Sequence, residues 1–195
     1  MIARPALLAV GLLVAQRAPA PVGSPPAQAA PAQAAPAQAD AGFPKAPAAR
    51  RQLHAGKLNF TLAPPDGWVE GTDKAALLVL EQPGDPRVRI AVRTLRKVDS
   101  SEPLESVIHS DIERFEAAHA DASLTPLEPV QTRGDERAEV RRLQSKSAPL
   151  YEEVAYLDSP VATVLLSLSA PGEKEFRAAL PLFEKLVASY QRKEQ

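Results

Sequence analysis

Apolar and polar residues alternate along several short stretches of this chain, the first of which begins at Leu58. Leu58, Phe60 and Leu62 are separated by polar residues, and this spacing predicts a strand with one buried face. Residues 64–67 (PPDG) form a turn signal, and Trp68 follows with its large apolar ring. A turn Trp beside a strand is more often buried than used for binding, so we expect Trp68 to fold onto the core.

Six further stretches have the length and pattern of strands, and the first two form a hairpin across residues 83–86 (PGDP). Pro126 and Pro129 place one of the stretches at a sheet edge. The last is apolar on both faces, which predicts a central strand covered on both sides. The six stretches are residues 75–82, 87–98, 124–132, 136–146, 150–157 and 161–170.

Two stretches have helical spacing instead. The first follows the helix-start cluster at residues 99–101, with Pro103 inside its first turn, and extends to about Ala118. The second begins after Gly172 and contains Pro181, which predicts a kink or a restart of the helix. The apolar stripes are Leu104, Val107, Ile108, Ile112 and Phe115 in the first helix, and Phe176, Ala179, Leu180, Phe183, Leu186, Val187 and Tyr190 in the second.

This order of elements predicts an α+β fold with a mostly antiparallel sheet. One helix is inserted between strands and one amphipathic helix closes the chain, so an α-β-α sandwich is expected. The folded part should be a single domain over residues 52–195, which is large enough to bury a core.

The first 51 residues have a different composition. Residues 1–20 resemble a secretory signal, with Arg4, a ten-residue apolar run and a small-x-small site ending at Ala20. Cleavage after Ala29 is the alternative. The run is too short to span a membrane as a helix, which takes about 20 residues. The sequence therefore predicts export to the periplasm or outside the cell.

Residues 21–51 contain three tandem pentapeptides, each beginning Pro-Ala-Gln-Ala, and predict a disordered, partly polyproline-II tether. The tether either provides reach across the cell envelope or is a low-complexity spacer. Arg50 and Arg51 close it, and we expect them to be solvated.

Charge and composition exclude several classes of function. Lys and Arg number 23 against 24 Asp and Glu, and this balance argues against a nucleic-acid binder. The chain has no cysteine, which excludes disulfides, thiolate catalysis and a lipid-modified cysteine.

No catalytic or metal-binding pattern stands out. His109 and His119 are ten residues apart on one helix, and His54 lies at the tether junction, so none has the spacing of a zinc pair. Glu152 and Glu153 point to opposite faces of a strand and cannot act as an acid–base couple there. We therefore expect no cofactor, no metal and no enzymatic activity.

The most suggestive feature is a row of arginines on the face opposite the apolar residues of stretch 87–98. Arg87, Arg89 and Arg93 form a candidate partner surface, joined by Arg137 and Arg141, for lipid headgroups, a cell-wall polymer or an acidic protein. The alternative is that these arginines pair with Glu139, Glu152 or Glu153 on the same face.

The start and end of the folded part resemble the PsbP-like and DcrB-like fold group. Phe60, Pro65, Gly67 and Trp68 carry the resemblance at the start. At the end it is carried by Phe176, Leu180, Pro181, Phe183, Leu186, Ser189 and Tyr190, so that it covers about residues 53–191. It implies a small, non-enzymatic protein, since members are photosystem subunits, envelope lipoproteins and chaperone or adaptor modules. It carries over no site residue.

These observations lead to one main hypothesis and two alternatives. We expect an exported, non-enzymatic binding or assembly module of the cell envelope that holds a protein partner. The first alternative is a small-ligand or lipid carrier, which needs an apolar pocket between helix and sheet. The second is an enzyme, which needs a cluster of titratable groups in a cleft.

Overall fold

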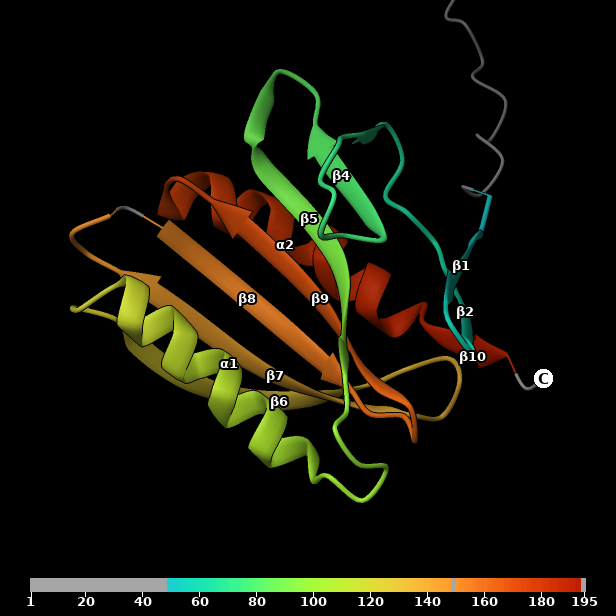
Figure 1. Cartoon of the computed structure of the whole chain (residues 1–195). Coiled ribbons are helices and arrows are strands. Elements are labelled where there is room, and N and C mark those ends of the chain that lie inside the picture. Colours follow the sequence, from blue (N-terminus) through green and yellow to red (C-terminus); the bar gives the residue numbers. More distant parts are fainter. Residues whose placement is uncertain (1–48, 149, 194–195) are drawn as a thin grey trace, which may run out of the picture. The chain divides into compact units, whose positions relative to one another are not determined.

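The computed structural model describes residues 49–148 and 150–193. The signal predicted over residues 1–20 and most of the tether predicted over residues 21–51 lie outside the described residues. Within the described residues the chain forms ten strands and two helices (Figure 1). They are β1 (Arg51–Ala55), β2 (Leu58–Leu62), β3 (Val69–Glu70), β4 (Leu78–Gln82), β5 (Asp85–Arg96), α1 (Leu104–Ala118), β6 (Ser123–Gln131), β7 (Arg137–Ser145), β8 (Leu150–Leu157), β9 (Ala162–Ala170), α2 (Glu173–Ala188) and β10 (Gln191–Lys193).

Seven of these strands form one antiparallel sheet in the order β3-β4-β5-β9-β8-β7-β6. β9 lies in the middle, and all of its residues except Ser169 are buried, so the predicted central strand is confirmed. β6, which contains Pro126 and Pro129, is an edge strand as expected, because proline cannot donate a ladder hydrogen bond.

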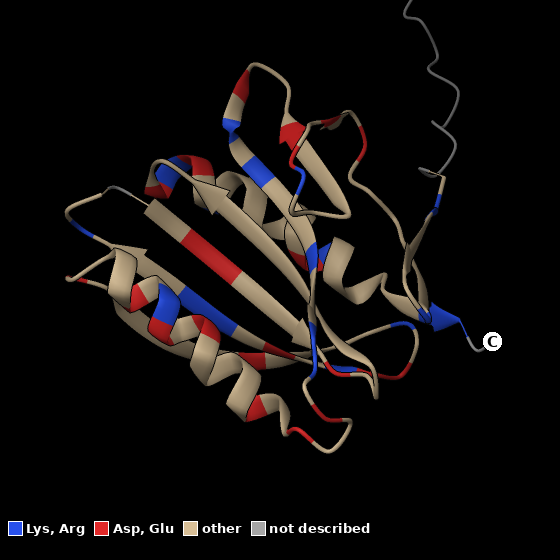
Figure 2. Cartoon of the chain, viewed as in Figure 1, with Lys and Arg blue, Asp and Glu red and all other residues tan. Residues whose placement is uncertain are grey.

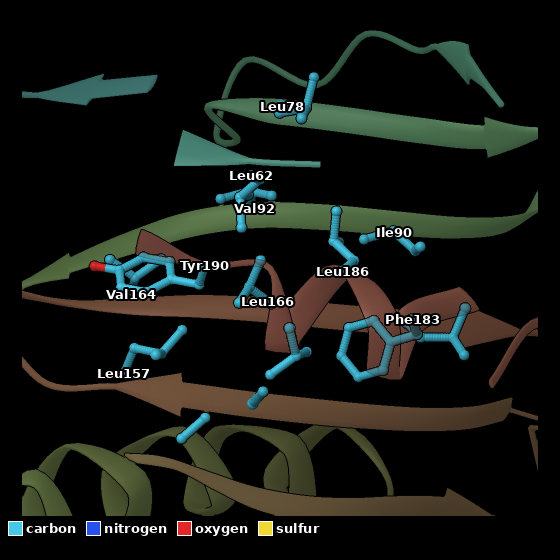
Figure 3. Close-up of a cluster of buried hydrophobic side chains, with 14 of the residues drawn as sticks. Leu62, Leu78, Ile90, Val92, Leu157, Val164, Leu166, Phe183, Leu186 and Tyr190 are labelled. Atoms are coloured by element: carbon cyan, nitrogen blue, oxygen red, sulfur yellow. The ribbon is translucent and has the colours of Figure 1, made fainter. Parts of the chain in front are cut away.

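The two helices cover opposite faces of this sheet (Figure 1). α2 and β2 share the larger core (Figure 3). Within this core Phe60, Phe183 and Tyr190 are at most 1% exposed. α1 packs on the other face over a smaller cluster of six buried residues: Ile108, Ile112, Leu143, Val154, Tyr156 and Leu165. The α+β class and the α-β-α sandwich are therefore confirmed.

A second sheet of three strands, β1-β2-β10, lies beside α2 and was not fully predicted. β1 begins at Arg51, inside the segment assigned to the tether. Arg50 is not simply solvated, because its Nη2 donates to Thr61 Oγ1 (2.9 Å) and to the Ser189 carbonyl (2.7 Å). The Ser189 hydroxyl in turn accepts from the Ala63 N–H (2.8 Å), so this serine joins the small sheet to the end of α2.

The helix boundaries differ from the predictions at both prolines. Pro103 is the N-cap of α1 and not part of its first turn. α2 does not restart at Pro181 but continues through it as one helix. Pro181 is exposed, while Ala179, Phe183 and Leu186 are buried on the opposite side, and their packing offsets the backbone hydrogen bond that proline lacks.

Trp68 packs against the main core and is partly buried, as expected. The turn before it places Gly67 at φ +80°, a conformation that glycine adopts at no steric cost. The Trp68 N–H closes this turn on the Pro65 carbonyl (3.4 Å). The opening Pro-x-Gly-Trp motif is thus a turn that returns an aromatic ring to the core.

Candidate functional site

The arginine row of β5 lies on the same face of the main sheet as α1. Arg87 and Arg89 are exposed and Arg93 is half-buried, and they alternate with the buried Val88, Ile90 and Val92. α1 contacts β7, β8 and β9 but leaves the β4–β5 side of this face without a covering helix (Figure 1). We call the area formed by Arg87, Arg89 and Ser169, which is paired with Arg89 in the sheet, the open face.

Two of the three arginines in the row form direct ion pairs with described residues. Arg87 Nε lies 2.8 Å from Asp85 Oδ1, and Arg93 Nη2 lies 3.2 Å from Asp73 Oδ2. The Ala75 N–H, followed by the Arg93 guanidinium, holds the pKa of Asp73 below its ordinary value. Within the described part of the chain no carboxylate pairs directly with Arg89. Asp73 and Glu152 interact with Arg89 only through longer-range electrostatic attraction. Figure 2 shows the basic positions that recur along β5.

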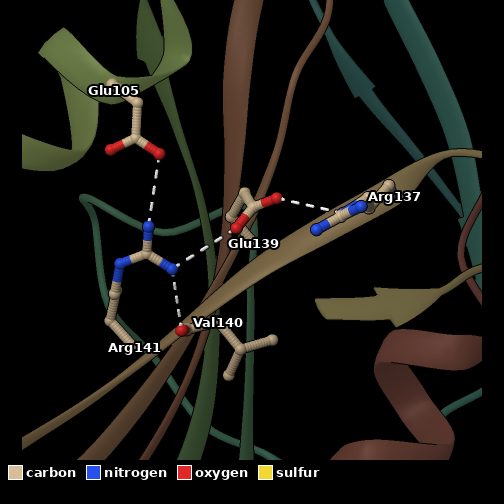
Figure 4. Close-up of polar contacts among 5 residues, drawn as sticks. All are labelled: Glu105, Arg137, Glu139, Val140 and Arg141. Carbon is tan, nitrogen blue, oxygen red and sulfur yellow. Dashed lines mark hydrogen bonds and ion pairs between the residues drawn. The ribbon is translucent and has the colours of Figure 1, made fainter. Parts of the chain in front are cut away.

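Arg137 and Arg141 do not extend this row, because local carboxylates neutralise them (Figure 4). Arg137 Nε lies 3.2 Å from Glu139 Oε1. Arg141 reaches the same Glu139 (3.4 Å) and also Glu105 at the start of α1 (3.2 Å). Both arginines therefore pair with Glu139, as the alternative prediction stated. The pairing runs along β7 and not across two neighbouring strands.

A pocket of about 290 Å³ opens between α1 and the sheet, next to the open face. We call it the α1 pocket. Its apolar surface comes from strands and from one ring of α1, and its polar groups come from β5, β8, β9 and α1. The lining residues are Arg93, Leu95, Asp111, Arg114, Phe115, Leu143, Glu152, Val154, Leu165 and Ser167.

Charged groups in the α1 pocket are strongly affected by burial. Burial raises the pKa of Glu152, and the nearby Asp111 raises it further, while Arg93 and Ser167 oppose the shift. Burial also raises the pKa of Tyr156, whose hydroxyl donates to Asp111 Oδ2 (2.8 Å). Arg93 has a buried Nε with no hydrogen-bond partner in the described residues. A buried donor without an acceptor is costly to the folded state.

Sequence reasoning did not find this pocket. Asp111, Glu152 and Ser167 line it from three different elements, and only the tertiary fold brings them to one place. The available signal was that Glu152 shares a face with Val154 and Tyr156 beneath an apolar helix stripe. Glu152 and Glu153 do point to opposite faces, as predicted: Glu153 lies on the α2 side, where it pairs with Arg142 (2.7 Å).

None of the three histidines lines the α1 pocket. His54 is on β1 next to Asn59, and His109 pairs with Glu113 on the exposed side of α1 (3.2 Å). His119 stacks on Phe115 with ring centroids 4.6 Å apart. Among residues 49–148 and 150–193, no three His, Asp or Glu side chains are grouped as metal ligands. Neither helix of this region has the length and apolar character of a membrane span.

Comparison with known proteins identifies the fold. No protein-family model matches the sequence, and no curated protein matches it. The solution structure of cyanobacterial PsbP (CyanoP) from Synechocystis sp. PCC 6803 does match, with a TM-score of 0.51 and 10% identity over 79% of this chain and 96% of that one. The crystal structure of LpqN, involved in cell envelope biogenesis of Mycobacterium tuberculosis, matches with a TM-score of 0.50 and 12% identity over 75% of this chain and 91% of that one.

These comparisons and the observed layers define a class of fold. The chain is an α+β sandwich with one antiparallel sheet between two helices. Its fold is that of the PsbP-like group, so the predicted resemblance is confirmed at the level of fold.

Proposed function

We propose that this chain is an exported, non-enzymatic binding or assembly module of the cell envelope that holds a protein partner on the open face. The observation that carries the proposal is the uncovered part of the sheet beside the α1 pocket, where Arg89 is exposed and no carboxylate of residues 49–148 and 150–193 pairs with it directly. An unpaired cation next to a partly apolar recess is suited to a partner with a surface carboxylate, because complementary charge orients the encounter.

The location in the envelope has two supports. The signal predicted over residues 1–20 favours export. LpqN, which shares the fold, is involved in cell envelope biogenesis in its own organism. The non-enzymatic assignment follows from the resemblance to the PsbP-like group. The α1 pocket, where Asp111 and Glu152 lie in a recess beside Ser167, is the place that an enzyme would use instead.

A small-molecule carrier is the second candidate, and the α1 pocket is the observation that favours it. The core under α2 does not favour it, because Phe60, Phe183 and Tyr190 fill the space that a lipid would need. The α1 pocket, at about 290 Å³, is at the lower limit of ordinary ligand pockets, about 300–1,000 Å³. It would hold a small group and not a lipid.

A cross-linked pull-down from the envelope fraction of the source organism tests the protein-partner proposal. The full chain is compared with Arg89→Glu and with Arg133→Glu, which makes the same charge change at an exposed turn residue far along the sequence. We expect one recurrent partner for the wild type and Arg133→Glu, with at least a fivefold loss for Arg89→Glu. If all three chains recover the same amount of partner, the open face is not the binding surface. If none of them recovers a partner, the protein-partner proposal is wrong.

A further inference from the structure

A second pocket, which we call the basic pocket, lies where the β1–β2 turn, the β8–β9 turn and the loop between β5 and α1 meet (Figure 1). Its volume is about 590 Å³, within the range of about 300–1,000 Å³ of ordinary ligand pockets. Arg96, which lines it, comes seven residues after Arg89 on β5, roughly 23 Å along the strand. The basic pocket shares no lining residue with the α1 pocket, so it is a separate site.

The lining of the basic pocket carries an excess of positive charge. Lys57, Arg96 and Lys97 supply three cations, and none of the described residues that line the pocket has a carboxylate. The whole chain has 23 basic and 24 acidic residues, so the excess is local and not a property of the chain. A recess lined by charges of one sign focuses their field and attracts ions of the opposite sign, here anions.

Three carboxylates lie close in sequence to the pocket, and the chain itself engages each of them. Asp158 Oδ1 lies 2.7 Å from Lys97 Nζ. Glu102 and Asp99 each accept from a backbone N–H of the β5–α1 loop, both at 3.0 Å. None of the three lines the pocket, so the turns that form its walls hold their carboxylates outside it.

Lys97 shapes the pocket, and we assign it no contact with a ligand. Its side chain is only 4% exposed, and Nζ also donates to the Glu102 carbonyl (2.9 Å). It therefore ties the β5–α1 loop to the β8–β9 turn, which are two of the three walls. Contact with a ligand is left to the exposed side chains of Lys57 and Arg96. No carboxylate of the described residues pairs with the Arg96 guanidinium, which has five N–H donors.

The remaining walls are mostly apolar. They come from Ala55 at the end of β1, Pro160 and Val161 in the β8–β9 turn, and Ala162 at the start of β9. Val161 is 42% exposed although it is a large apolar residue. An apolar group placed against it would gain about 25 cal/mol for each Å² removed from water. The pocket therefore suits an occupant that has both an anionic end and an apolar body.

A smaller recess extends the positive region. It has a volume of about 250 Å³ and shares Lys57 and Val161 with the basic pocket. Its further cations are Arg192 and Lys193 of β10, and no Asp or Glu of the described chain lines it either (Figure 2). Glu136 offsets the charge of Arg192 from outside this lining (3.3 Å). An anion that approaches the basic pocket from this side thus meets a second group of cations.

We propose that the basic pocket binds an organic anion in which a phosphate or carboxylate is attached to an apolar body. The anionic group pairs with Arg96 and Lys57, since a guanidinium holds either group through two parallel hydrogen bonds. The apolar body lies against Val161 and Ala162. A free small molecule and the headgroup of an anionic lipid share this chemistry. This binding activity goes beyond the protein-partner proposal and does not depend on it.

The test titrates the full chain with four small probes at pH 7 and low ionic strength. Hexyl phosphate and hexanoate combine an anionic group with an apolar chain, whereas hexanol lacks the charge and inorganic phosphate lacks the apolar body. Chemical-shift changes of backbone amides report binding. We expect the tighter of the two anionic probes to shift residues 55–57, 96–100 and 161–162. It should bind at least about tenfold more tightly than hexanol or inorganic phosphate, and less tightly as salt is added.

Three variants locate the site. Arg96→Gln should weaken the anionic probes at least about fivefold, because it removes the guanidinium. Val161→Asp places a carboxylate in the lining and should abolish their binding. Both side chains are exposed, so neither change removes core packing. Lys174→Gln is the matched control, since it removes an exposed cation of α2 outside both recesses, and it should leave binding unchanged.

Vesicles distinguish the two sources of the anion. Co-sedimentation with phosphatidylcholine vesicles that contain phosphatidylglycerol, lost on Arg96→Gln and absent for phosphatidylcholine alone, would assign a lipid headgroup. Probe binding without co-sedimentation would assign a free small anion.

The proposal is wrong if no probe or vesicle binds, or if hexanol or inorganic phosphate binds as tightly as the anionic probes. It is also wrong if Arg96→Gln and Val161→Asp bind these probes like the wild type. Since the titrations contain no protein partner, such a failure leaves the proposed use of the open face unaffected.

Discussion

Arg142 Nη2 lies 2.7 Å from Glu153 Oε2, and the pair joins β7 to β8 beneath α2. The Glu153 side chain is only 4% exposed. The Arg142 guanidinium also lies over the ring of Phe176, 5.5 Å from its centroid. This pair is therefore part of the core packing and not of the surface charge.

Arg142→Met should lower the free energy of unfolding by about 3 kcal/mol at pH 7, because it leaves the Glu153 carboxylate buried and unpaired. Burial already raises the pKa of Glu153 while Arg142 lowers it, so the deficit should shrink as the pH falls and the carboxyl is protonated. Urea unfolding at several pH values measures this. Arg177→Met is the control, since its pair with Glu173 on α2 is exposed and its loss should cost less than about 0.5 kcal/mol.

Glu152→Gln should raise the free energy of unfolding at pH 7. Because burial raises the pKa of Glu152 above its ordinary 4.5, the folded state holds a proton more tightly than the unfolded state does. The wild type should therefore lose stability as the pH rises from 4.5 through the folded-state pKa, and the variant should lack this loss. Equal pH profiles for the two chains would contradict the burial of this carboxylate.

Asp121, just after α1, stabilises the β7–β8 turn. Its carboxylate accepts from the Ser145 and Ser147 hydroxyls, both at 2.8 Å, and from the Lys146 N–H at 2.8 Å. The Ser145 and Ser147 hydroxyls lower the pKa of Asp121 to about 2.

Asp121→Asn should therefore destabilise the protein at neutral pH, because the amide cannot accept all these bonds. The stabilisation is fully present above the ordinary value of 3.8 and is lost as the pH falls through about 2, so the two chains should converge near pH 2. Thermal unfolding between pH 2 and pH 7 measures the difference. A difference that persists unchanged at pH 2 would show that Asp121 does not act through its charge.

α1 should open more readily than α2. Three residues of α1 are buried, against five of α2, and α1 packs on the smaller of the two apolar clusters. Native-state hydrogen exchange should give α1 amides an opening free energy at least about 1 kcal/mol below that of α2. Equal protection of the two helices would mean that the α1 pocket does not loosen the packing on its side.

The sequence predicts the main sheet well and the small sheet poorly, for physical reasons. Strands such as β5 and β9 have long runs with clear burial patterns, and apolar stripes mark α1 and α2. β10 has only three residues and no apolar pattern, so nothing in it distinguishes a strand from a frayed end. β1 begins with Arg51, whose pairing with Leu62 is fixed by the tertiary fold and not by local sequence.

The candidate site shows the same division. The placement of Arg87, Arg89 and Arg93 on one face follows from the two-residue period of a strand. The period does not predict which of these arginines forms an ion pair. Asp73 comes from the β3–β4 loop, and only the tertiary fold brings it to Arg93. The use of this face by a partner stays a prediction.

The most direct test of that prediction is site-specific photo-cross-linking of the full chain in the envelope of the source organism. A photo-reactive residue at Ser169 reports on the open face, and one at Glu184, an exposed position of α2, reports on the opposite side. We predict one discrete cross-linked protein from position 169, lost when Arg89→Glu is introduced, and none from position 184. A cross-link from position 184 alone, or one from 169 that does not depend on Arg89, would contradict the open face as the partner surface.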